Sequence, residues 1–353
     1  MDWYSSLALS LSLSLIISLI SIHCEVTLTL IVVSVPIQMR VKVGEVPVEL
    51  MRAIAVKRSS GAVHPQFEAV SLGNLELVQC LHAQGRLDGQ MTHNGWNVAH
   101  CAASGGHVAV LKFLHAQGMV DVHAKNQQGS PIAYSGADDL EVLKWLYETF
   151  GRAVVSVKNV AGRSLAHIAA SKDNVSVLEW LYSLELVDAK AKDRHGWTAA
   201  HCAAQLRALQ WLHARNMFDA EAKDNLGWTV AHHSARWGRQ DILVWLDEMG
   251  MLEDGTDRDG WNLAHMATYC GSAPLLQWLY TRGFVDVKEK DHSGRSIAHI
   301  AATDGNLAIL TWLHSVNMLD AKDMDGDGET FVTLAASYPH IQQWLPKRFR
   351  IRS

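Results

Sequence analysis

Cysteine is scarce in this sequence, and its placement excludes a domain built on disulfides or on a zinc ribbon. The 353 residues include five cysteines, an odd number, and none of them form a Cys-x-x-Cys spacing. Disulfide frameworks and structural zinc sites need cysteines in pairs at short spacings. We interpret the thiols as small apolar side chains in a reducing compartment, which predicts a cytoplasmic protein. They are Cys24, Cys80, Cys101, Cys202 and Cys270.

Motifs for catalysis and for cofactors are also lacking. The chain has no phosphate-cradling glycine loop, no Gly-x-Ser-x-Gly turn and no catalytic Cys/His spacing. Residues 323–328 begin like a calcium-binding loop, but Leu334 stands at the twelfth position, where a bidentate glutamate is required. We therefore predict that the protein is not an enzyme and has no cofactor, no metal and no small-molecule substrate.

Neither sign of charge dominates the chain. Lys and Arg number 31 against 36 Asp and Glu, and the two signs are interspersed. A nucleic-acid partner would need clustered basic residues, so we predict none. The basic tail at residues 347–353 has two interpretations, an address for the nucleus or for an anionic surface, and an ordinary solvated terminus.

A repeated histidine phrase is the main feature that is present. Residues 95–100, 227–232 and 260–265 each read Gly-Trp, two further residues, then Ala-His. With Tyr134 and Thr333 in the same slot, the steps along the series are 31 to 34 residues. Such a period indicates an array of small structural units and not one central core. The repeated histidines are His100, His167, His201, His232, His265 and His299.

Residues 257–291 show the parts of one unit. Residues 257–260 form an Asp-x-x-Gly turn, and Asn262 then stands at the N-cap of a short alanine-rich helix. A second helix places leucines and a tryptophan of residues 275–279 on one apolar face, and Gly283 is a signal for its C-terminal end. Sister units have Ser164, Thr198, Thr229 and Ser296 at the N-cap.

This order of turn, helix, turn, helix and extended loop resembles the ankyrin repeat, and the phrase around His100 resembles its Thr-Pro-Leu-His-x-Ala signature. The resemblance covers about residues 61–346 as nine units, in a Trp-rich form that reads Gly-Trp-Thr-x-Ala-His-x-Ala-Ala. Alanine replaces the usual leucine before the histidine, and the usual proline is absent. The resemblance implies an all-α repeat solenoid of stacked helix-turn-helix units with β-hairpin or loop fingers. It also implies a non-catalytic scaffold that binds another protein through its concave surface of fingers and inner helices.

We interpret the histidines and one set of tryptophans as structural. A zinc site needs three or four ligands at one point, whereas these histidines form a ladder with one in each unit. The resemblance implies that each histidine bonds the capping Ser or Thr and the backbone of the adjoining unit. The second-helix tryptophans are predicted to form a core stripe. They are Trp145, Trp180, Trp211, Trp245, Trp278, Trp312 and Trp344.

A second set of tryptophans follows the turn glycine, beside the finger. Two interpretations stay open, because tryptophan is enriched where partners bind, and because such residues also stack on their neighbours and stiffen a row of fingers. The residues at the finger tips differ between units on a constant frame, which predicts a partner surface there. The candidate partner-binding residues are Trp197, Trp228, Trp261, Trp96, Arg194, His195, Arg258, Trp237 and Tyr269.

Residues 1–60 are predicted to lie outside the repeats. Residues 5–22 alternate Leu, Ser and Ile without a charge, and residues 26–35 add a second apolar run. A cleaved signal lacks the positive residues it needs, since Asp2 is the only charge before the run. A membrane anchor at residues 5–35 would make the protein a membrane-tethered ankyrin adaptor with repeats facing the cytoplasm. The third interpretation is a mispredicted start or disordered sequence, because a CT dinucleotide tract encodes Leu-Ser alternation.

Three units are shorter than the others. Unit three lacks two residues around residues 135–139, unit five lacks three after Ala204, and unit nine lacks two around residues 337–340. Because a repeat draws its stability from its neighbours, each deletion is expected to loosen the stack locally.

Overall fold

The structure is a computed structural model that describes residues 26–32, 35–41, 64–93, 95–286 and 288–345. The chain forms two compact parts, residues 1–68 and 69–353, and each is described by itself.

A β-hairpin lies in the first part. Strand β1 (Val26–Val32) pairs antiparallel with β2 (Val35–Val41), with Val26 opposite Val41 and Val32 opposite Val35. The sequence analysis did not predict it, although both strands are rich in β-branched residues, which favour strands. The anchor predicted at residues 5–35 lies mostly outside the described residues, and its residues 26–32 are β1. No helix within the described ranges is both long and apolar enough to cross a membrane.

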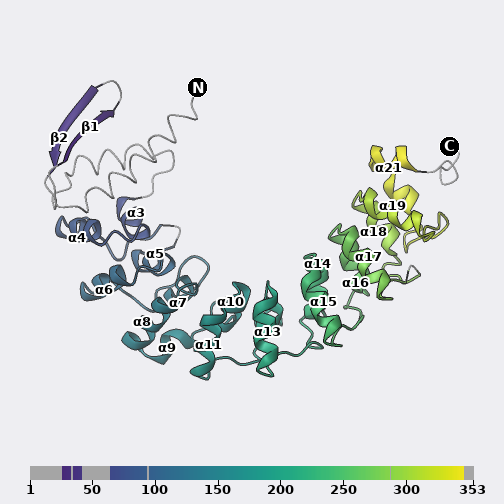
Figure 1. The fold of residues 1–353 in the computed structure, drawn as a ribbon, viewed down its shortest axis with the longest axis horizontal. Coiled ribbons are helices and arrows are strands. Elements are labelled where there is room, and N and C mark those ends of the chain that lie inside the picture. Colours follow the sequence, from purple (N-terminus) through teal and green to yellow (C-terminus); the bar gives the residue numbers. More distant parts are fainter. Residues whose placement is uncertain (1–25, 33–34, 42–63, 94, 287, 346–353) are drawn as a thin grey trace. The chain divides into compact units, whose positions relative to one another are not determined.

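Helices in antiparallel pairs, each pair one repeat unit, follow from residue 65 to residue 344 (Figure 1). Within each pair the first, inner helix leads into the second, outer helix through a short turn. A five-residue helix that we did not predict, α9 (Arg152–Ser156), follows the third pair. The pairs are α3 (Pro65–Ser71) and α4 (Leu75–Ala83), α5 (Val98–Ser104) and α6 (Val108–Ala116), α7 (Ile132–Ser135) and α8 (Leu140–Phe150), α10 (Leu165–Ser171) and α11 (Val175–Ser183), α12 (Ala199–Cys202) and α13 (Leu206–Ala214), α14 (Val230–Arg236) and α15 (Gln240–Glu248), α16 (Leu263–Tyr269) and α17 (Ala273–Thr281), α18 (Ile297–Thr303) and α19 (Leu307–Ser315), and α20 (Phe331–Leu334), continued by the 3-10 turn Ala335–Ser337, with α21 (Pro339–Trp344).

The inner helices begin where the sequence predicts. The cap residues Ser164, Thr198, Thr229, Asn262 and Ser296 all stand at N-caps, and each belongs to a capping box with the histidine three residues later. The small alanines that follow are buried, which lets neighbouring inner helices approach closely. The all-α repeat solenoid is thus confirmed.

The core lies between the inner and outer helices of each unit. In α16 and α17, Leu263, Met266, Leu275, Leu276 and Leu279 are fully buried. Removing one such leucine side chain costs about 2–5 kcal/mol in a well-packed core. The core is therefore a row of small clusters, one for each unit, joined along the array.

The tryptophans of the outer helices differ from the core stripe that we predicted. Trp145, Trp211 and Trp245 are buried, but the other four are only half-buried. Six of the seven tryptophan rings pack edge to face on an aromatic ring of the preceding unit. In that unit, the aromatic residue stands two residues after the position that is equivalent to the tryptophan. For example, the ring of Tyr182 lies 5.9 Å from that of Trp211, with 89° between the planes. The other pairs are His82–Phe113, His115–Trp145, Tyr147–Trp180, His213–Trp245, Tyr280–Trp312 and His314–Trp344.

One interface lacks this aromatic pair. Asp247 occupies the position two residues after Trp245, and it forms an ion pair with Arg282 at 3.1 Å. The guanidinium of Arg282 also lies 5.9 Å from the ring of Trp278. The outer contact between units six and seven is therefore made by charge and not by two rings.

The three short units have shortened inner helices. Helices α7, α12 and α20 have four residues each, whereas the inner helices of the other units have seven. In unit five, α12 ends at Cys202 and α13 begins at Leu206. Fewer inner-helix residues are left to pack against the neighbouring units.

We expect unit five to open more readily than the units beside it. Backbone amides of residues 201–213 should show the lowest protection from hydrogen exchange inside the array, because the four-residue α12 has few contacts with α14, the next inner helix. Exchange measured by mass spectrometry on the native protein tests this, with the equivalent residues 232–244 of unit six as the matched segment. Equal protection of the two segments would contradict the expectation.

Candidate functional site

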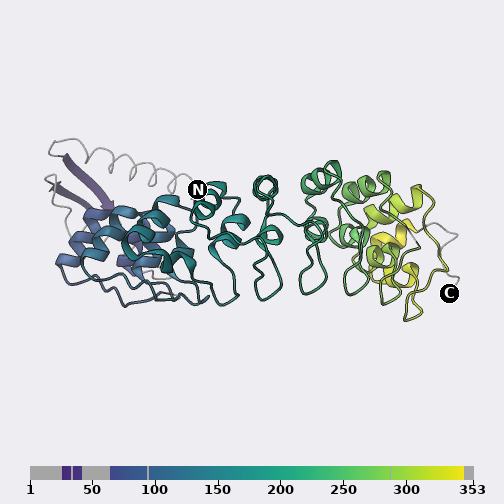
Figure 2. The ribbon, with the colours of Figure 1, turned by 90° about the horizontal axis from the view of Figure 1, so that it is seen from below.

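The fingers and the ends of the inner helices form the candidate site. Figure 2 shows the finger loops of the repeat array extending from one side of the layer of helices. From unit three onward, each finger begins with an aspartate or asparagine and ends in a glycine that stands two residues before the N-cap of the next inner helix. The local structure of the finger therefore decides where its tip side chains lie.

The first residue of each finger folds that finger. In unit six, Asp224 Oδ1 accepts the backbone N–H groups of Leu226 at 2.8 Å and of Trp228 at 2.9 Å. Gly227 between them has a φ of 86°, a left-handed conformation that a side chain disfavours. Asp257 and Asp291 accept the same two backbone bonds in the next units. The Asp-x-x-Gly sequence thus builds the turn by a local side-chain bond.

Backbone bonds also join neighbouring finger tips. The N–H of Asn225 donates to the carbonyl of His195 at 3.0 Å, and the N–H of Arg258 donates to that of Leu226 at 3.0 Å. His292 continues the series with a bond to Asp259 at 2.9 Å. These bonds use only the main chain, so the tip side chains vary without loss of the frame.

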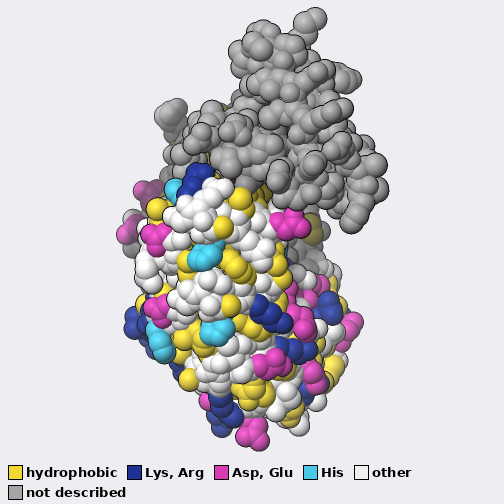
Figure 3. All heavy atoms as spheres, turned by 90° about the vertical axis from the view of Figure 1, so that its left-hand side faces the viewer, with side chains coloured by type: hydrophobic (Ala, Val, Ile, Leu, Met, Phe, Trp, Pro, Cys, Tyr) yellow, Lys and Arg dark blue, Asp and Glu magenta, His cyan; other side chains and the backbone are white. Residues whose placement is uncertain are grey.

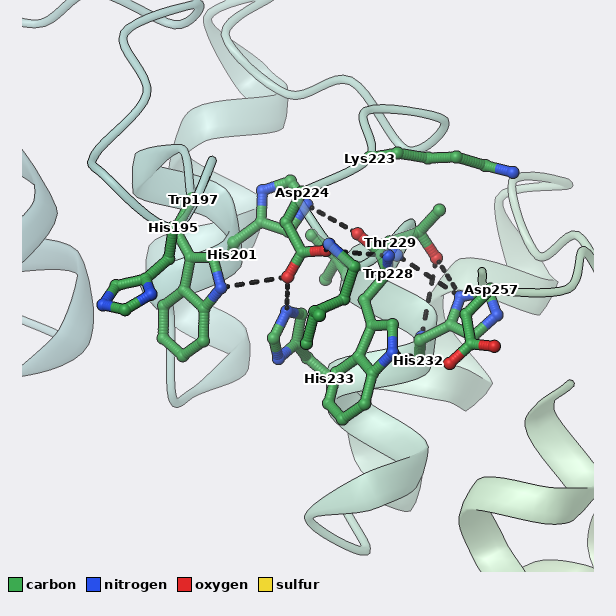
Figure 4. Close-up of polar contacts among 12 residues, drawn as sticks. His195, Trp197, His201, Lys223, Asp224, Trp228, Thr229, His232, His233 and Asp257 are labelled. Atoms are coloured by element: carbon green, nitrogen blue, oxygen red, sulfur yellow. Dashed lines mark hydrogen bonds and ion pairs between the residues drawn. The ribbon is translucent and has the colours of Figure 1, made fainter. Parts of the chain in front are cut away.

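The tryptophans Trp197, Trp228 and Trp261 link each finger to the next. All three are half-buried, and each indole Nε1 donates to the first aspartate of the following finger. The distances are 3.0 Å from Trp197 to Asp224 and 2.7 Å from Trp228 to Asp257 (Figure 4). The distance from Trp261 to Asp291 is 3.0 Å. The indole N–H groups therefore point along the array, which is the stiffening role that the sequence left open.

Arg163 does the same in unit four. Its Nε donates to Asp193 Oδ2 at 2.9 Å, and its guanidinium lies 5.1 Å from the ring of Trp197. What the link needs is therefore an N–H donor on a flat side chain at this position. Trp96 differs from the other three, because among the described residues its indole donates no hydrogen bond to the next finger; its ring lies 6.2 Å from that of His100 within its own unit.

His233 adds a second donor to Asp224. Its Nε2 lies 3.0 Å from Asp224 Oδ2, and its ring sits between those of Trp197 and Trp228, at 4.7 and 5.0 Å (Figure 4). Burial opposes ionisation of Asp224, but the bonds from His233 and from the finger backbone outweigh it and lower its pKa to about 2. We missed this role, because the sequence drew attention to the histidines of the repeated slot and His233 lies one residue after that slot. In the part of the chain that the structure describes, no group of three or more His, Cys, Asp or Glu side chains is placed to hold a metal ion.

Four of the six repeated histidines link their inner helix to the next unit, as the resemblance implies, whereas Nε2 of His100 and of His265 is buried without a hydrogen-bond partner among the described residues. The backbone N–H of Thr229 donates to His232 Nδ1 at 3.3 Å, so the ring proton is on Nε2, and Nε2 donates to the carbonyl of Gly255 at 2.9 Å. His167, His201 and His299 make the equivalent pair of contacts.

Tyr134 and Thr333, which occupy the same slot, behave differently. The hydroxyl of Tyr134 lies 2.5 Å from the carbonyl oxygen of Arg163 and 2.7 Å from that of Val157, so it provides the same link to the next unit. Thr333 bonds only to Thr330 of its own unit.

The remaining candidate residues lie exposed. Arg194, His195 and Arg258 are at finger tips, and the structure leaves their side chains in solvent. Trp237, directly after α14, is 70% exposed, and Tyr269 at the end of α16 is 43% exposed. The structure thus separates the candidates into three half-buried links between fingers, one tryptophan without such a link and five exposed side chains.

We expect the hydrogen bond from the Trp228 indole to stabilise the fold more than the packing of its ring does. Trp228→Phe keeps a flat ring but leaves Asp257 without that donor, so the free energy of unfolding should fall by about 1.5–3 kcal/mol, the range for a bond to a charged group. Urea denaturation followed by circular dichroism measures the loss. The matched control is Trp180→Phe in an outer helix, which keeps its edge contact with Tyr147 and should lose less. Equal losses would contradict the assigned role.

Stability should decrease in mild acid. Burial lowers the pKa of five ladder histidines, and burial together with the charge of His233 lowers that of His201 from 6.5 to about 4. Between these values the unfolded chain binds the proton and the folded chain does not, so stability falls as pH falls, by roughly 3 kcal/mol for His201. The five are His100, His167, His201, His232 and His265.

Melting temperatures measured between pH 7 and pH 4 test this. The variant His201→Gln should reduce the slope, because it removes one such proton site. The exposed tip residue offers a matched control, and His195→Gln should leave the slope unchanged. A melting temperature that does not vary over this pH range would refute the expectation.

A family model agrees with this geometry. The model, which describes ankyrin repeats, matches residues 67–159 and 132–214. The chain is 32% identical over 151 residues to an L-asparaginase of Dirofilaria immitis. The aligned region makes up 41% of this chain and 25% of the relative. It therefore spans about a quarter of the length of that relative.

A solved structure is also similar to this chain. The crystal structure of the ankyrin repeat domain of Bcl-3, described as a unique member of the IkappaB protein family, has 24% identity and a TM-score of 0.46. The match covers 61% of this chain and 98% of that one. The family match at residues 67–214 and the recurrence of the same unit as far as residue 344 lead to one identification. The chain is an ankyrin-repeat protein.

Proposed function

We propose that this array is a scaffold that binds another protein through its finger tips and inner-helix ends. Ankyrin repeats generally mediate binding between proteins, and their fold is typically non-catalytic. One observation carries the proposal. The finger frame is closed by internal bonds, whereas the side chains mounted on it, including Arg194, His195 and Arg258, are exposed and differ from unit to unit. A rigid frame with varied side chains binds at a low entropic cost.

Charge and composition support a protein partner over a nucleic acid. Figure 3 shows acidic and basic side chains scattered over one face of the molecule, without an extended region of one sign. The four described cysteines, Cys80, Cys101, Cys202 and Cys270, are free thiols, which supports the cytoplasm as the location that we propose.

The exposed contact residues are separable from the structural ones. Changing Trp197, Trp228 or Trp261 removes bonds between units as well as surface, so a lost partner would have two explanations. Trp237 and Tyr269 are better test positions, because their side chains donate no hydrogen bond to a neighbouring unit among the residues that the structure describes.

We expect the variant Trp237→Ala with Tyr269→Ala to lose captured partners. The full-length chain with a C-terminal tag serves as bait, and quantitative mass spectrometry compares each captured protein between variants. Losses of at least about ten-fold are expected for the specific partners, because truncated aromatic anchors often cost more than 1 kcal/mol each.

The matched control changes exposed residues of outer helices, Lys112→Glu with Met249→Ser, and should leave capture unchanged. Circular dichroism and melting curves establish that both variants fold. The proposal is refuted if the outer-helix variant loses the partners that the inner-helix variant keeps, or if neither loses any.

A further inference from the structure

Three consecutive inner helices end side by side in units six to eight. The last residues of α14, α16 and α18 are Arg236, Tyr269 and Thr303. The residues that follow include Trp237 and Asp304. Because α16 packs between α14 and α18, these ends form one continuous surface beside the fingers.

A pocket opens in this surface. It has a volume of about 330 Å³ and is lined by Trp261, Tyr269, Arg295, Ile300, Thr303 and Asp304. Pockets that bind ligands begin at roughly 300 Å³, so this one suits a single large side chain better than a whole small molecule. We call it the helix-end pocket.

Contacts within the chain hold the side chains that form the helix-end pocket. The rings of Trp261 and Tyr269 meet edge to face at 5.5 Å. Trp261 Nε1 and Arg295 Nε both donate to Asp291 Oδ2, at 3.0 and 2.9 Å. These bonds hold two of the side chains that line the pocket in place. A preformed pocket spares the partner the entropic cost of ordering these side chains.

A guanidinium lies at the rim of the pocket. The Arg236 guanidinium carbon is 4.0 Å from the centroid of the Tyr269 ring and 5.8 Å from that of Trp237. Among the described residues it has no carboxylate within ion-pair distance. Stacking on Tyr269 holds its flat face, so its N–H edge remains available for a bidentate carboxylate.

The other charged residues at the pocket limit the charge that a bound ligand can carry. Arg295 is neutralised by Asp291, with 2.8 Å between Nη2 and Oδ2. Asp304 is the remaining acid at the pocket, and burial raises its pKa against the influence of Arg295 and Arg236. A cationic ligand would be repelled by the guanidinium of Arg236 over the Tyr269 ring and by that of Arg295 over the Trp261 ring. A carboxylate would instead form an ion pair with Arg236. A second carboxylate would be repelled by Asp304.

We propose that the helix-end pocket binds an extended peptide segment of the partner, with one large apolar or aromatic side chain in the pocket and a single adjacent carboxylate on Arg236. This inference rests on the proposed function, since it names the chemistry that the partner would present. The cluster of Arg236, Trp237 and Tyr269 also combines the three residue types most enriched at binding hot spots.

Synthetic peptides test the proposal directly. The probe is acetyl-Gly-Ser-Glu-Phe-Gly-Ser-amide, and its matched controls carry Lys in place of Glu or Ala in place of Phe. Binding to the full-length chain is followed by the ¹H–¹⁵N signals of the tryptophan indoles, and the Trp237 and Trp261 signals are assigned from their Phe variants. The Glu-Phe peptide should shift both signals and bind at least about ten-fold more tightly than either control.

Two variants test the charges. Arg236→Gln should abolish the preference for the Glu peptide over the Lys peptide, and Arg236→Lys should restore part of it. Asp304→Asn should strengthen binding of the Glu peptide, because a like charge is removed. Arg194→Gln, at a finger tip of unit five, should change neither.

The proposal is overturned if the Lys peptide binds as tightly as the Glu peptide, if the Ala peptide shifts the indole signals equally, or if saturating Glu-Phe peptide leaves both signals in place. These outcomes are distinct from failure of the proposed function. Partner capture that depends on Trp237 and Tyr269 would then show a scaffold whose partner presents different chemistry.

Discussion

The finger aspartates hold two units at once. Asp224 folds its own finger through backbone N–H groups, and the same carboxylate receives Trp197 of the preceding unit and His233 of its own. A unit of little more than thirty residues has too small an apolar core to fold alone, so bonds across units decide whether the array holds together. Replacing a donor leaves a buried carboxylate short of a partner, which costs more than the bond itself contributes. Fixed fingers, and with them a defined outer surface, depend on this carboxylate.

Histidine serves three separate purposes in this chain. In the ladder, Nδ1 of His232 accepts a backbone bond and Nε2 donates one, and burial lowers the pKa of His232, which favours this neutral form. His233, one residue after His232, instead faces a carboxylate. Histidines such as His213 on the outer helices provide a ring edge to the next tryptophan. The surrounding contacts, and not the residue type, determine which purpose applies.

Much of the fold could be predicted because its signals are local. An Asp-x-x-Gly turn and a capping Ser, Thr or Asn act within a few residues, and their period locates every unit. How deeply a side chain is buried depends instead on residues that are distant in the sequence. Periodicity places Trp180 on the apolar face of its helix, but only the packing of the next unit shows that its ring remains half-exposed. The bond between His233 and Asp224 and the stacking of Arg236 on Tyr269 likewise depend on which side chains meet in space.

The links between fingers that Trp197, Trp228 and Trp261 make have a direction, since the donor belongs to one unit and the acceptor to the next. A duplicated copy of unit five, six or seven would therefore arrive with a donor for its successor and an acceptor for its predecessor. Arg163 in place of tryptophan shows that the joint tolerates a change of residue when the N–H is kept. The short units retain the turn and slot positions and have lost residues between their helices. Such an array is suited to grow or shrink by recombination in whole units during evolution, while its display residues diverge one at a time.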